Sequence, residues 1–211
     1  MAERGNLIIV SGPSGSGKSA IAAGVLGSLP DLRFSVSYTT RAPRGQECSG
    51  VEYHFVSREC FEELIRRGEF LEWASVYGNL YGTARKAVDE SLDSGRDVLL
   101  DIDVQGARIV RTECPGATGV FIMPPSYGVL RERLEQRKLD KDYVIEQRLR
   151  TACNEIRLYA DYDYLIINRH LSEAVAALKA VILGLRCRMP RRAEDAQAIV
   201  ATFGGTDAEN P

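Results

Sequence analysis

Short, wholly apolar runs recur along the chain and predict the strands of one sheet. Strands that are apolar at every position are buried on both faces, as in a parallel sheet covered by helices. The runs are residues 7–10, 98–100, 119–123 and 165–167. Segments with helical spacing of apolar residues follow them, at residues 19–29, 104–114 and 172–188. This alternation predicts an α/β fold with a parallel sheet flanked by helices.

The middle of the chain breaks the alternation of strands and helices. Between residues 34 and 83 the pattern favours strands separated by polar loops that contain Gly and Pro. Gly78 and Asn79 are typical of a turn, and Thr83 is placed to cap a helix that ends before Gly95. The strand-like stretches are residues 34–40, 51–56 and 70–77. We therefore expect a β-rich insert that stands off the parallel sheet.

Two further helices are predicted after Pro124 and Pro125, which interrupt the chain. Ser126 is placed to cap the first, and a charged segment at residues 137–142 precedes the second. Beyond residue 190 the sequence becomes polar, and we expect a polar C-terminal tail over residues 191–211.

The turn after the first apolar run carries the clearest chemistry. It fits the pattern G-x-x-x-x-G-K-[ST] and lies between a predicted strand and a predicted helix. Glycines let successive backbone N–H groups turn inward toward phosphate oxygens, and the helix N-terminus adds its positive dipole end. The lysine would reach the β and γ phosphates of a nucleotide. The predicted ATP-binding residues here are Gly12, Pro13, Ser14, Gly15, Ser16, Gly17, Lys18 and Ser19.

A magnesium site is expected beside this loop. The Ser19 hydroxyl would ligate Mg²⁺, and Asp101 follows directly on the apolar run at residues 98–100. A carboxylate at such a strand end helps to hold the metal in P-loop proteins. Asp103 lies two residues further on and is the alternative. We predict Ser19 and Asp101 as the metal-side residues.

Composition narrows the class of protein. A net charge of −2 gives no electrostatic reason to expect a nucleic-acid partner. The 5 cysteines are scattered and form no C-x-x-C pair, a pattern that argues against a disulfide framework and against a structural zinc site. No apolar run approaches the roughly 20 residues of a membrane span. The first residues lack the pattern of a signal peptide, so we expect a cytoplasmic enzyme with no membrane partner.

A series of motifs then resembles one family. The insert contains S-V-S-Y-T-T-R-A-P-R at residues 35–44, F-L-E-W at 70–73 and G-N-L-Y-G-T at 78–83, and L-D-I-D-V-Q-G follows at 100–106. With the phosphate-binding loop, these closely resemble the guanylate kinase family from about Leu7 to Arg188. The resemblance implies a P-loop NTPase-type fold and transfer of a phosphoryl group from Mg-ATP to GMP, giving GDP and ADP.

The resemblance also implies roles for single residues of the acceptor site. Glu72 and Asp103 match the readers of guanine, and Ser37 and Thr83 match hydroxyl contacts to the base. The matches to the residues that bind the GMP phosphate are Arg41, Arg44, Tyr53 and Tyr81. The chemistry of the base supports this, since guanine offers two neighbouring donors that one carboxylate accepts, whereas adenine offers a bare acceptor.

The resemblance extends to the predicted helices after Pro125. Arg133, Arg137 and Arg148 match lid arginines that close over ATP, although Lys138 stands where the family usually has Gly. With Lys18 and Arg44, the residues Arg137 and Arg148 would stabilise the phosphoryl group in flight. Asn168 is a candidate adenine contact, and a turn at the strand end explains it nearly as well.

The resemblance divides the chain into parts. A guanylate kinase-like domain at residues 1–190 would contain the GMP-binding insert (34–83) and a small helical lid (126–154). Its core would comprise residues 5–33, 84–125 and 155–190. Two alternatives are a phosphopeptide-binding module and a kinase for another nucleoside monophosphate, and self-association stays open. The intact phosphate-binding loop favours an enzyme over the binding module.

Overall fold

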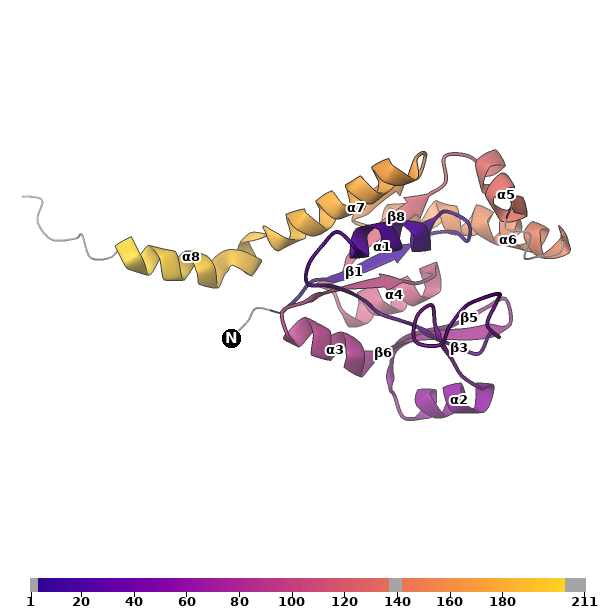
Figure 1. Cartoon of the computed structure of the whole chain (residues 1–211), viewed down its shortest axis with the longest axis horizontal. Helices are drawn as coiled ribbons and strands as arrows, with labels where there is room; N and C mark the ends of the chain where they lie inside the picture. The colour runs from indigo at the N-terminus through magenta and orange to yellow at the C-terminus, as the bar shows by residue number, and fades with distance from the viewer. Residues whose placement is uncertain (1–3, 137–141, 204–211) are drawn as a thin grey trace, which may run out of the picture.

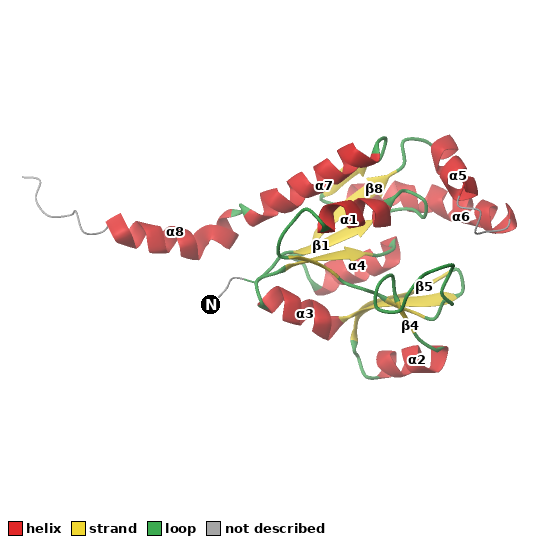
Figure 2. Ribbon diagram, viewed as in Figure 1, coloured by secondary structure: helices red, strands yellow, loops and turns green. Residues whose placement is uncertain are grey.

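A five-stranded parallel sheet forms the centre of the molecule. The computed structural model describes residues 4–136 and 142–203, and its strands run in the order β2-β7-β1-β8-β9 (Figures 1 and 2). These strands are β1 (Leu7–Ser11), β2 (Leu32–Phe34), β7 (Asp97–Asp101), β8 (Thr118–Met123) and β9 (Tyr164–Ile167). The order places β1 between β7 and β8, so the loop after β1 emerges at the middle of the carboxyl edge.

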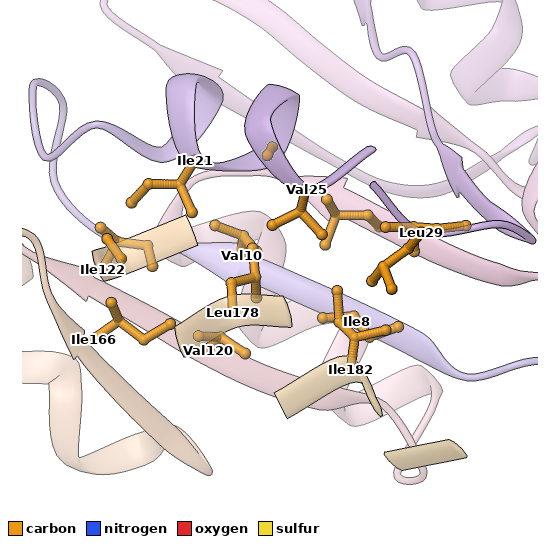
Figure 3. Packing of buried hydrophobic residues seen from close by; sticks show 14 of the residues in the cluster. Ile8, Val10, Ile21, Val25, Leu29, Val120, Ile122, Ile166, Leu178 and Ile182 are labelled. Atoms are coloured by element: carbon orange, nitrogen blue, oxygen red, sulfur yellow. The ribbon is translucent and has the colours of Figure 1, made fainter. Parts of the chain in front are cut away.

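Helices cover both faces of this sheet because its strands are apolar on both sides. On one face, α1 (Lys18–Leu26) and α7 (Leu171–Arg186) bury Ile21, Val25 and Leu178 against Ile8 and Val10 of β1 (Figure 3). On the other face lie α3 (Arg85–Asp93) and α4 (Val104–Glu113), which form a second apolar cluster with β1 and β7. The parallel sheet predicted from the sequence is confirmed.

A second, four-stranded sheet stands beside the first and has its own apolar cluster. Its order is β4-β3-β6-β5, with β3–β6 and β5–β6 antiparallel. The elements are β3 (Tyr38–Thr39), β4 (His54–Phe55), α2 (Arg58–Arg66), β5 (Phe70–Val76) and β6 (Asn79–Ala84). Phe61 of α2 packs against Phe70 and Leu80, with ring centroids of the two phenylalanines 4.5 Å apart.

A fourth apolar cluster lies in the helices that follow β8. It joins Leu130 and Leu134 of α5 (Tyr127–Gln136) to Ile145 and Leu149 of α6 (Asp142–Glu155). A 3₁₀ helix, Ile156–Asp161, then leads back to β9. These helices and the second sheet lie at the same end of the molecule in Figure 1, on either side of the phosphate-binding loop.

The strand predicted at residues 34–40 is wrong as a single element. Phe34 ends β2 and pairs with Leu99 of the parallel sheet, whereas Tyr38 begins β3 and pairs with Gly82 of the second sheet. The intervening residues cross from one sheet to the other. The stretch predicted at residues 51–56 contributes only the two-residue strand β4.

The turn of the hairpin in the second sheet lies one residue earlier than the sequence predicts. The turn residues are Tyr77 and Gly78, and Asn79 already begins β6, a strand that the sequence did not predict. Thr83 lies inside β6 and does not cap the next helix, which is preceded by Ala84.

The last strand and the C-terminal segment add two details to the fold that the sequence did not predict. The strand at residues 165–167 forms the sheet edge, so Leu165 and Ile167 are 43% and 42% exposed and Ile166 alone of the three is buried. Residues 191–203 of the predicted polar tail lie in a helix, α8 (Met189–Phe203), which continues away from the body beyond α7 (Figure 1), and residues 204–211 lie outside the described residues. Within residues 4–136 and 142–203, no helix is both long and apolar enough to cross a membrane.

Candidate functional site

The loop between β1 and α1 is shaped by glycines. Gly12, Gly15 and Gly17 have φ values of 137°, 89° and 98°, a region that side chains other than that of Gly rarely adopt. Space is limiting too, because a Cβ on Gly12 would lie 2.3 Å from the carbonyl oxygen of Ile122. Lys18 folds back over the loop, and its Nζ donates to the carbonyls of Gly12 at 2.8 Å and Pro13 at 3.3 Å.

Two polar side chains support this loop from behind. Asn168 is buried, and its Nδ2 donates to the carbonyl of Ser16 at 2.8 Å. The guanidinium of Arg133 donates to the same carbonyl at 3.4 Å and to the carbonyl of Asn168 at 2.9 Å. In this structure both predicted ATP-binding side chains therefore fix the backbone of the phosphate-binding loop. A side-chain contact of Asn168 with adenine stays a prediction.

Ser19 and Asp101 meet at the carboxyl edge of the sheet. The hydroxyl of Ser19, the residue that follows Lys18, donates to Oδ2 of Asp101 at 2.7 Å. Hydroxyl and carboxylate oxygens are the ligand type that Mg²⁺ prefers, and two protein ligands leave positions for nucleotide phosphates and water. No group of three or more His, Cys, Asp or Glu side chains suited to a metal occurs among the described residues. The donor set fits a magnesium shared with a nucleotide.

Glu72 is a buried carboxyl group at the junction of the two sheets. It is 5% exposed, and Oε1 accepts a hydrogen bond of 2.6 Å from the hydroxyl of Thr83 on the neighbouring strand. Burial raises the pKa of Glu72 to about 7, the charge of Asp103 adds to the rise, and the Thr83 hydrogen bond opposes it. The neighbours of Glu72 in β5 differ in exposure, with Leu71 at 4% and Trp73 at 43%, and the pairing register of the strand shifts between Phe70 and Glu72.

Asp103 lies close to Glu72 and has a local structural role. It caps α4, and Oδ1 accepts from the backbone N–H groups of Gln105 at 2.6 Å and Gly106 at 3.0 Å. Both bonds use the same oxygen, so Oδ2 lies outside this cap. Gly106 also touches Glu72, since a Cβ added there would lie 2.4 Å from Oε2. The two predicted guanine readers are thus brought together by the start of α4.

A second cluster is built around Arg41. Its side chain is 10% exposed and forms a bidentate pair with Glu47 at 2.9 and 3.0 Å. The guanidinium carbon lies 5.3 Å from the ring centroid of Tyr53, which in turn lies 5.7 Å from that of Tyr81. Burial raises the pKa of the Tyr53 hydroxyl to about 12, so it is a donor at neutral pH. Three of the four predicted phosphate binders therefore share one cluster.

The remaining predicted acceptor-site residues lie around this cluster. The backbone N–H of Arg44 donates to Glu47 at 2.7 Å, which places Arg44 on the same loop as the Arg41 pair. Ser37 is 8% exposed, and its carbonyl accepts from the N–H of His54 at 2.8 Å. The pairing of Glu47 with Arg41 was not predicted, because five loop residues separate the two side chains and no regular spacing joins them.

The predicted lid arginines are only partly described. Arg148 is 7% exposed on α6, and its guanidinium lies over the ring of Tyr77, with 5.6 Å from the central carbon to the ring centroid. Arg137 and Lys138 lie outside the described residues.

Glu155, at the end of α6, is a half-buried carboxyl group that was not predicted from the sequence. Burial raises the pKa of Glu155, the charge of Lys18 opposes this rise and the charge of Asp103 adds to it.

Comparison with known proteins gives consistent similarities. The family model described as "Guanylate kinase" matches residues 4–184. A guanylate kinase of Idiomarina loihiensis is 48% identical over 190 residues, covering 89% of this chain and 90% of that protein. One from Pseudomonas fluorescens is 45% identical over 201 residues, covering 95% and 98%. The crystal structure of guanylate kinase from Anaplasma phagocytophilum has a TM-score of 0.77 and 34% identity, and 90% of each chain is covered.

Proposed function

The chain belongs to the guanylate kinase family, and from this premise we propose how its residues divide the work of phosphoryl transfer from ATP to GMP. The observation that carries the assignment is the buried carboxyl group of Glu72, held by Thr83 and covered by Gly106. A buried carboxylate requires donors, and guanine supplies two adjacent ones on its Watson–Crick edge.

In this assignment Glu72 accepts from guanine, and Asp103 uses the oxygen outside its helix cap. Ser37 and Thr83 add hydroxyl contacts to the base. Adenine would present an acceptor to the carboxylate and leave it unpaired, and sites built on such bonds discriminate by about 10⁴ or more. The choice of GMP over other monophosphates thus depends on hydrogen bonding at a buried carboxylate.

The Arg41 cluster is assigned to the phosphate of GMP. Arg41 and Arg44 would supply forked, charge-assisted bonds, and Tyr53 and Tyr81 would supply hydroxyl donors. The Glu47 pair fixes the fork of Arg41 before the substrate arrives, which lowers the entropy cost of binding. The support for this proposal is that the three buried or half-buried side chains already touch one another.

ATP is assigned to the phosphate-binding loop. Backbone N–H groups at residues 12–19 would hold the phosphates, with Lys18 at the β and γ positions. Arg133 and Asn168 stabilise this loop through the Ser16 carbonyl. Ser19 and Asp101 are the residues that would hold Mg²⁺, which when bound screens the phosphate charge.

Transfer itself needs charge neutralisation and positioning more than proton removal. An oxygen of the GMP phosphate bonds to the γ-phosphorus of ATP, and the bond to the bridging oxygen breaks, so ADP leaves with the electron pair. Lys18, Arg44 and Arg148 are assigned to stabilise the group in flight, together with Arg137, which lies outside the described residues.

The division of the chain is proposed as well. The second sheet and the helices α5 and α6 each have an apolar cluster separate from those of the parallel sheet, which supports a GMP-binding insert and a lid as distinct parts. Parts with their own clusters are able to move against the sheet without exposing its core. Cytoplasmic location, the absence of nucleic-acid and membrane partners, and self-association remain predictions from the sequence.

A substitution of Glu72 tests the assignment. In Glu72→Gln the amide opposes one guanine donor with its own N–H, so we expect kcat/KM for GMP to fall by about 10³-fold, in line with the loss of a buried hydrogen-bond reader. Activity is measured by a coupled assay of ADP formation with GMP, AMP, UMP and dTMP as acceptors. The wild-type enzyme should use GMP far better than the other three.

The matched control is Glu69→Gln, an exposed glutamate three residues earlier. It should retain the wild-type kcat/KM. Thermal unfolding of both variants reports whether a loss of activity comes from the site or from the fold. Wild-type kcat/KM for GMP in Glu72→Gln would contradict the assignment of the base-reading carboxylate.

A further inference from the structure

The turn of the β5–β6 hairpin contains an unusual residue. Tyr77 has φ 49° and Gly78 has φ 81°, so both central residues of the two-residue turn are left-handed. This geometry matches the twist of the strands and strongly favours Asn-Gly or Gly-Gly, since most side chains are strained there, whereas Gly is not and Asn is tolerated. A bulky aromatic residue at such a position suggests that its ring has a use beyond the turn.

The ring of Tyr77 reaches a different part of the molecule. It lies under the guanidinium of Arg148 on α6, with 5.6 Å from the central carbon to the ring centroid. Burial raises the pKa of the Tyr77 hydroxyl, and an interaction with the Thr151 side chain opposes the rise. Arg148 and Thr151 are three residues apart and therefore lie on one face of α6. The hairpin tip thus contacts the helix that carries a proposed transfer arginine.

The same hairpin carries the acceptor site. Glu72 on β5 pairs in register with Thr83 on β6, and Tyr81 on β6 belongs to the Arg41 cluster. The antiparallel ladder continues from this pair to Val76 and Asn79, next to the turn. Because a paired hairpin moves as one unit, a change in how it holds GMP reaches its tip.

We propose that Tyr77 is a positioning residue that holds the Arg148 guanidinium and links its placement to the GMP-binding hairpin. The inference rests on the proposed role of Arg148 in phosphoryl transfer. An aromatic face suits a guanidinium because the planar cation stacks on the ring while its N–H groups point outward along its edge. Tyr77 would thereby act on the transition state through Arg148.

The substitution Tyr77→Asn separates this role from a structural one. Asn tolerates the left-handed conformation better than Tyr, so the midpoint temperature of unfolding should stay the same or rise. The ring is lost, so we expect kcat to fall about 10-fold, the size of one well-placed cation–ring contact. The KM values for GMP and ATP should stay within about 2-fold, because binding of each nucleotide uses other residues.

Two companion variants sharpen the test. Tyr77→Phe keeps the ring and loses the hydroxyl, and it should retain most of the wild-type kcat. Tyr143→Asn changes a tyrosine that is 69% exposed on α6, the helix that carries Arg148, and it should leave kcat unchanged. If Tyr77→Phe loses as much kcat as Tyr77→Asn, or Tyr77→Asn keeps the wild-type kcat, the ring does not position the arginine.

The double variant of Tyr77→Asn with Arg148→Met shows whether the effect passes through the arginine. Met fills the buried volume without the charge, and Arg148→Met alone should lower kcat strongly. Adding Tyr77→Asn to it should then change kcat by less than about 2-fold, since the group being positioned is already gone. Additive losses would overturn the inference and leave the role of Arg148 intact. A wild-type kcat in Arg148→Met would instead remove the arginine from the mechanism, and the inference with it.

Discussion

At the scale of single residues, the protonation state of Glu72 has consequences for binding. Its ordinary pKa is 4.5, and burial raises it to about 7 in the folded protein without GMP. The folded state therefore holds this proton more tightly than the unfolded state, and its stability falls as the pH rises through the interval between these two values. In the proposed assignment guanine requires the ionised form of Glu72 as acceptor, so GMP binding below neutral pH would expel the proton.

Affinity for GMP should accordingly depend on pH. With a pKa of about 7, linkage predicts a dissociation constant about 10-fold higher at about pH 6 than at about pH 8. Calorimetric titration with GMP measures this ratio directly. The phosphate of GMP itself titrates near pH 6, which adds a second dependence.

Guanosine provides the control, because it has the base but no phosphate. Its inhibition constant against GMP should show the same 10-fold change, as expected for a single titrating carboxyl group. An inhibition constant that does not change over this interval would mean that Glu72 is ionised throughout, or that it does not receive the base.

At the scale of elements, the site is made where the start of α4 meets the β5–β6 hairpin. Asp103 caps α4 while contributing its charge, and Gly106 in the same first turn leaves room for the carboxyl group of Glu72. A side chain at residue 106 would occupy the space of that carboxyl group. The need for Gly inside a helix, where it is otherwise unfavourable, is explained by this contact.

Gly106→Ala should therefore damage the acceptor site more than the fold. The added methyl would lie 2.4 Å from Oε2 of Glu72 and displace it, and we expect the KM for GMP to rise by at least about 10-fold. The KM for ATP should be unchanged. Steady-state kinetics with each substrate varied in turn measures both.

Gly184→Ala is the matched control, since a Cβ there meets nothing within 4 Å in the helix α7. Gly184→Ala raises the helix propensity by the same amount as Gly106→Ala, about 1 kcal/mol, and its added methyl does not contact Glu72. An unaltered KM for GMP in Gly106→Ala would show that the carboxyl group has more freedom than the contact distance implies.

At the scale of the whole molecule, a buried charge network fixes the end opposite the site. Asp97 of β7 is 1% exposed and accepts from the backbone and the side chain of Asn6, both at 2.8 Å. It also accepts from Arg186 at the end of α7 at 2.6 Å, and Arg191 of α8 lies 3.6 Å away. One carboxylate thus ties the amino terminus, the sheet and both C-terminal helices together.

Asp97→Asn should destabilise the protein without affecting catalysis. Removing the charge leaves two buried or half-buried arginines without their anion, and breaking such a pair costs about 3–5 kcal/mol. Denaturant unfolding measures the loss, and kcat below the unfolding transition should match the wild type. Asp93→Asn, at a site 63% exposed, should change stability by less than about 1 kcal/mol. Equal stabilities of the two variants would contradict the role given to the network.

Much of this arrangement could be predicted from the sequence because the features concerned are local. The glycine spacing at residues 12–17 determines the loop conformation through backbone sterics, and the apolar runs determine which strands are buried. The motifs that identify the family are also contiguous stretches. For these reasons the parallel sheet, the family and its activity followed from the order of residues along the chain.

Tertiary structure alone decided what depends on residues distant in sequence. Residues 34–40 have one strand-like pattern, yet Phe34 pairs with Leu99 and Tyr38 with Gly82, because backbone pairing is set by which partner strand lies nearby. The raised pKa of Glu72 comes from burial against the start of α4, and the contact of Tyr77 with Arg148 joins two separate parts of the chain. Desolvation and side-chain contact depend on distances in space, which residue spacing does not determine.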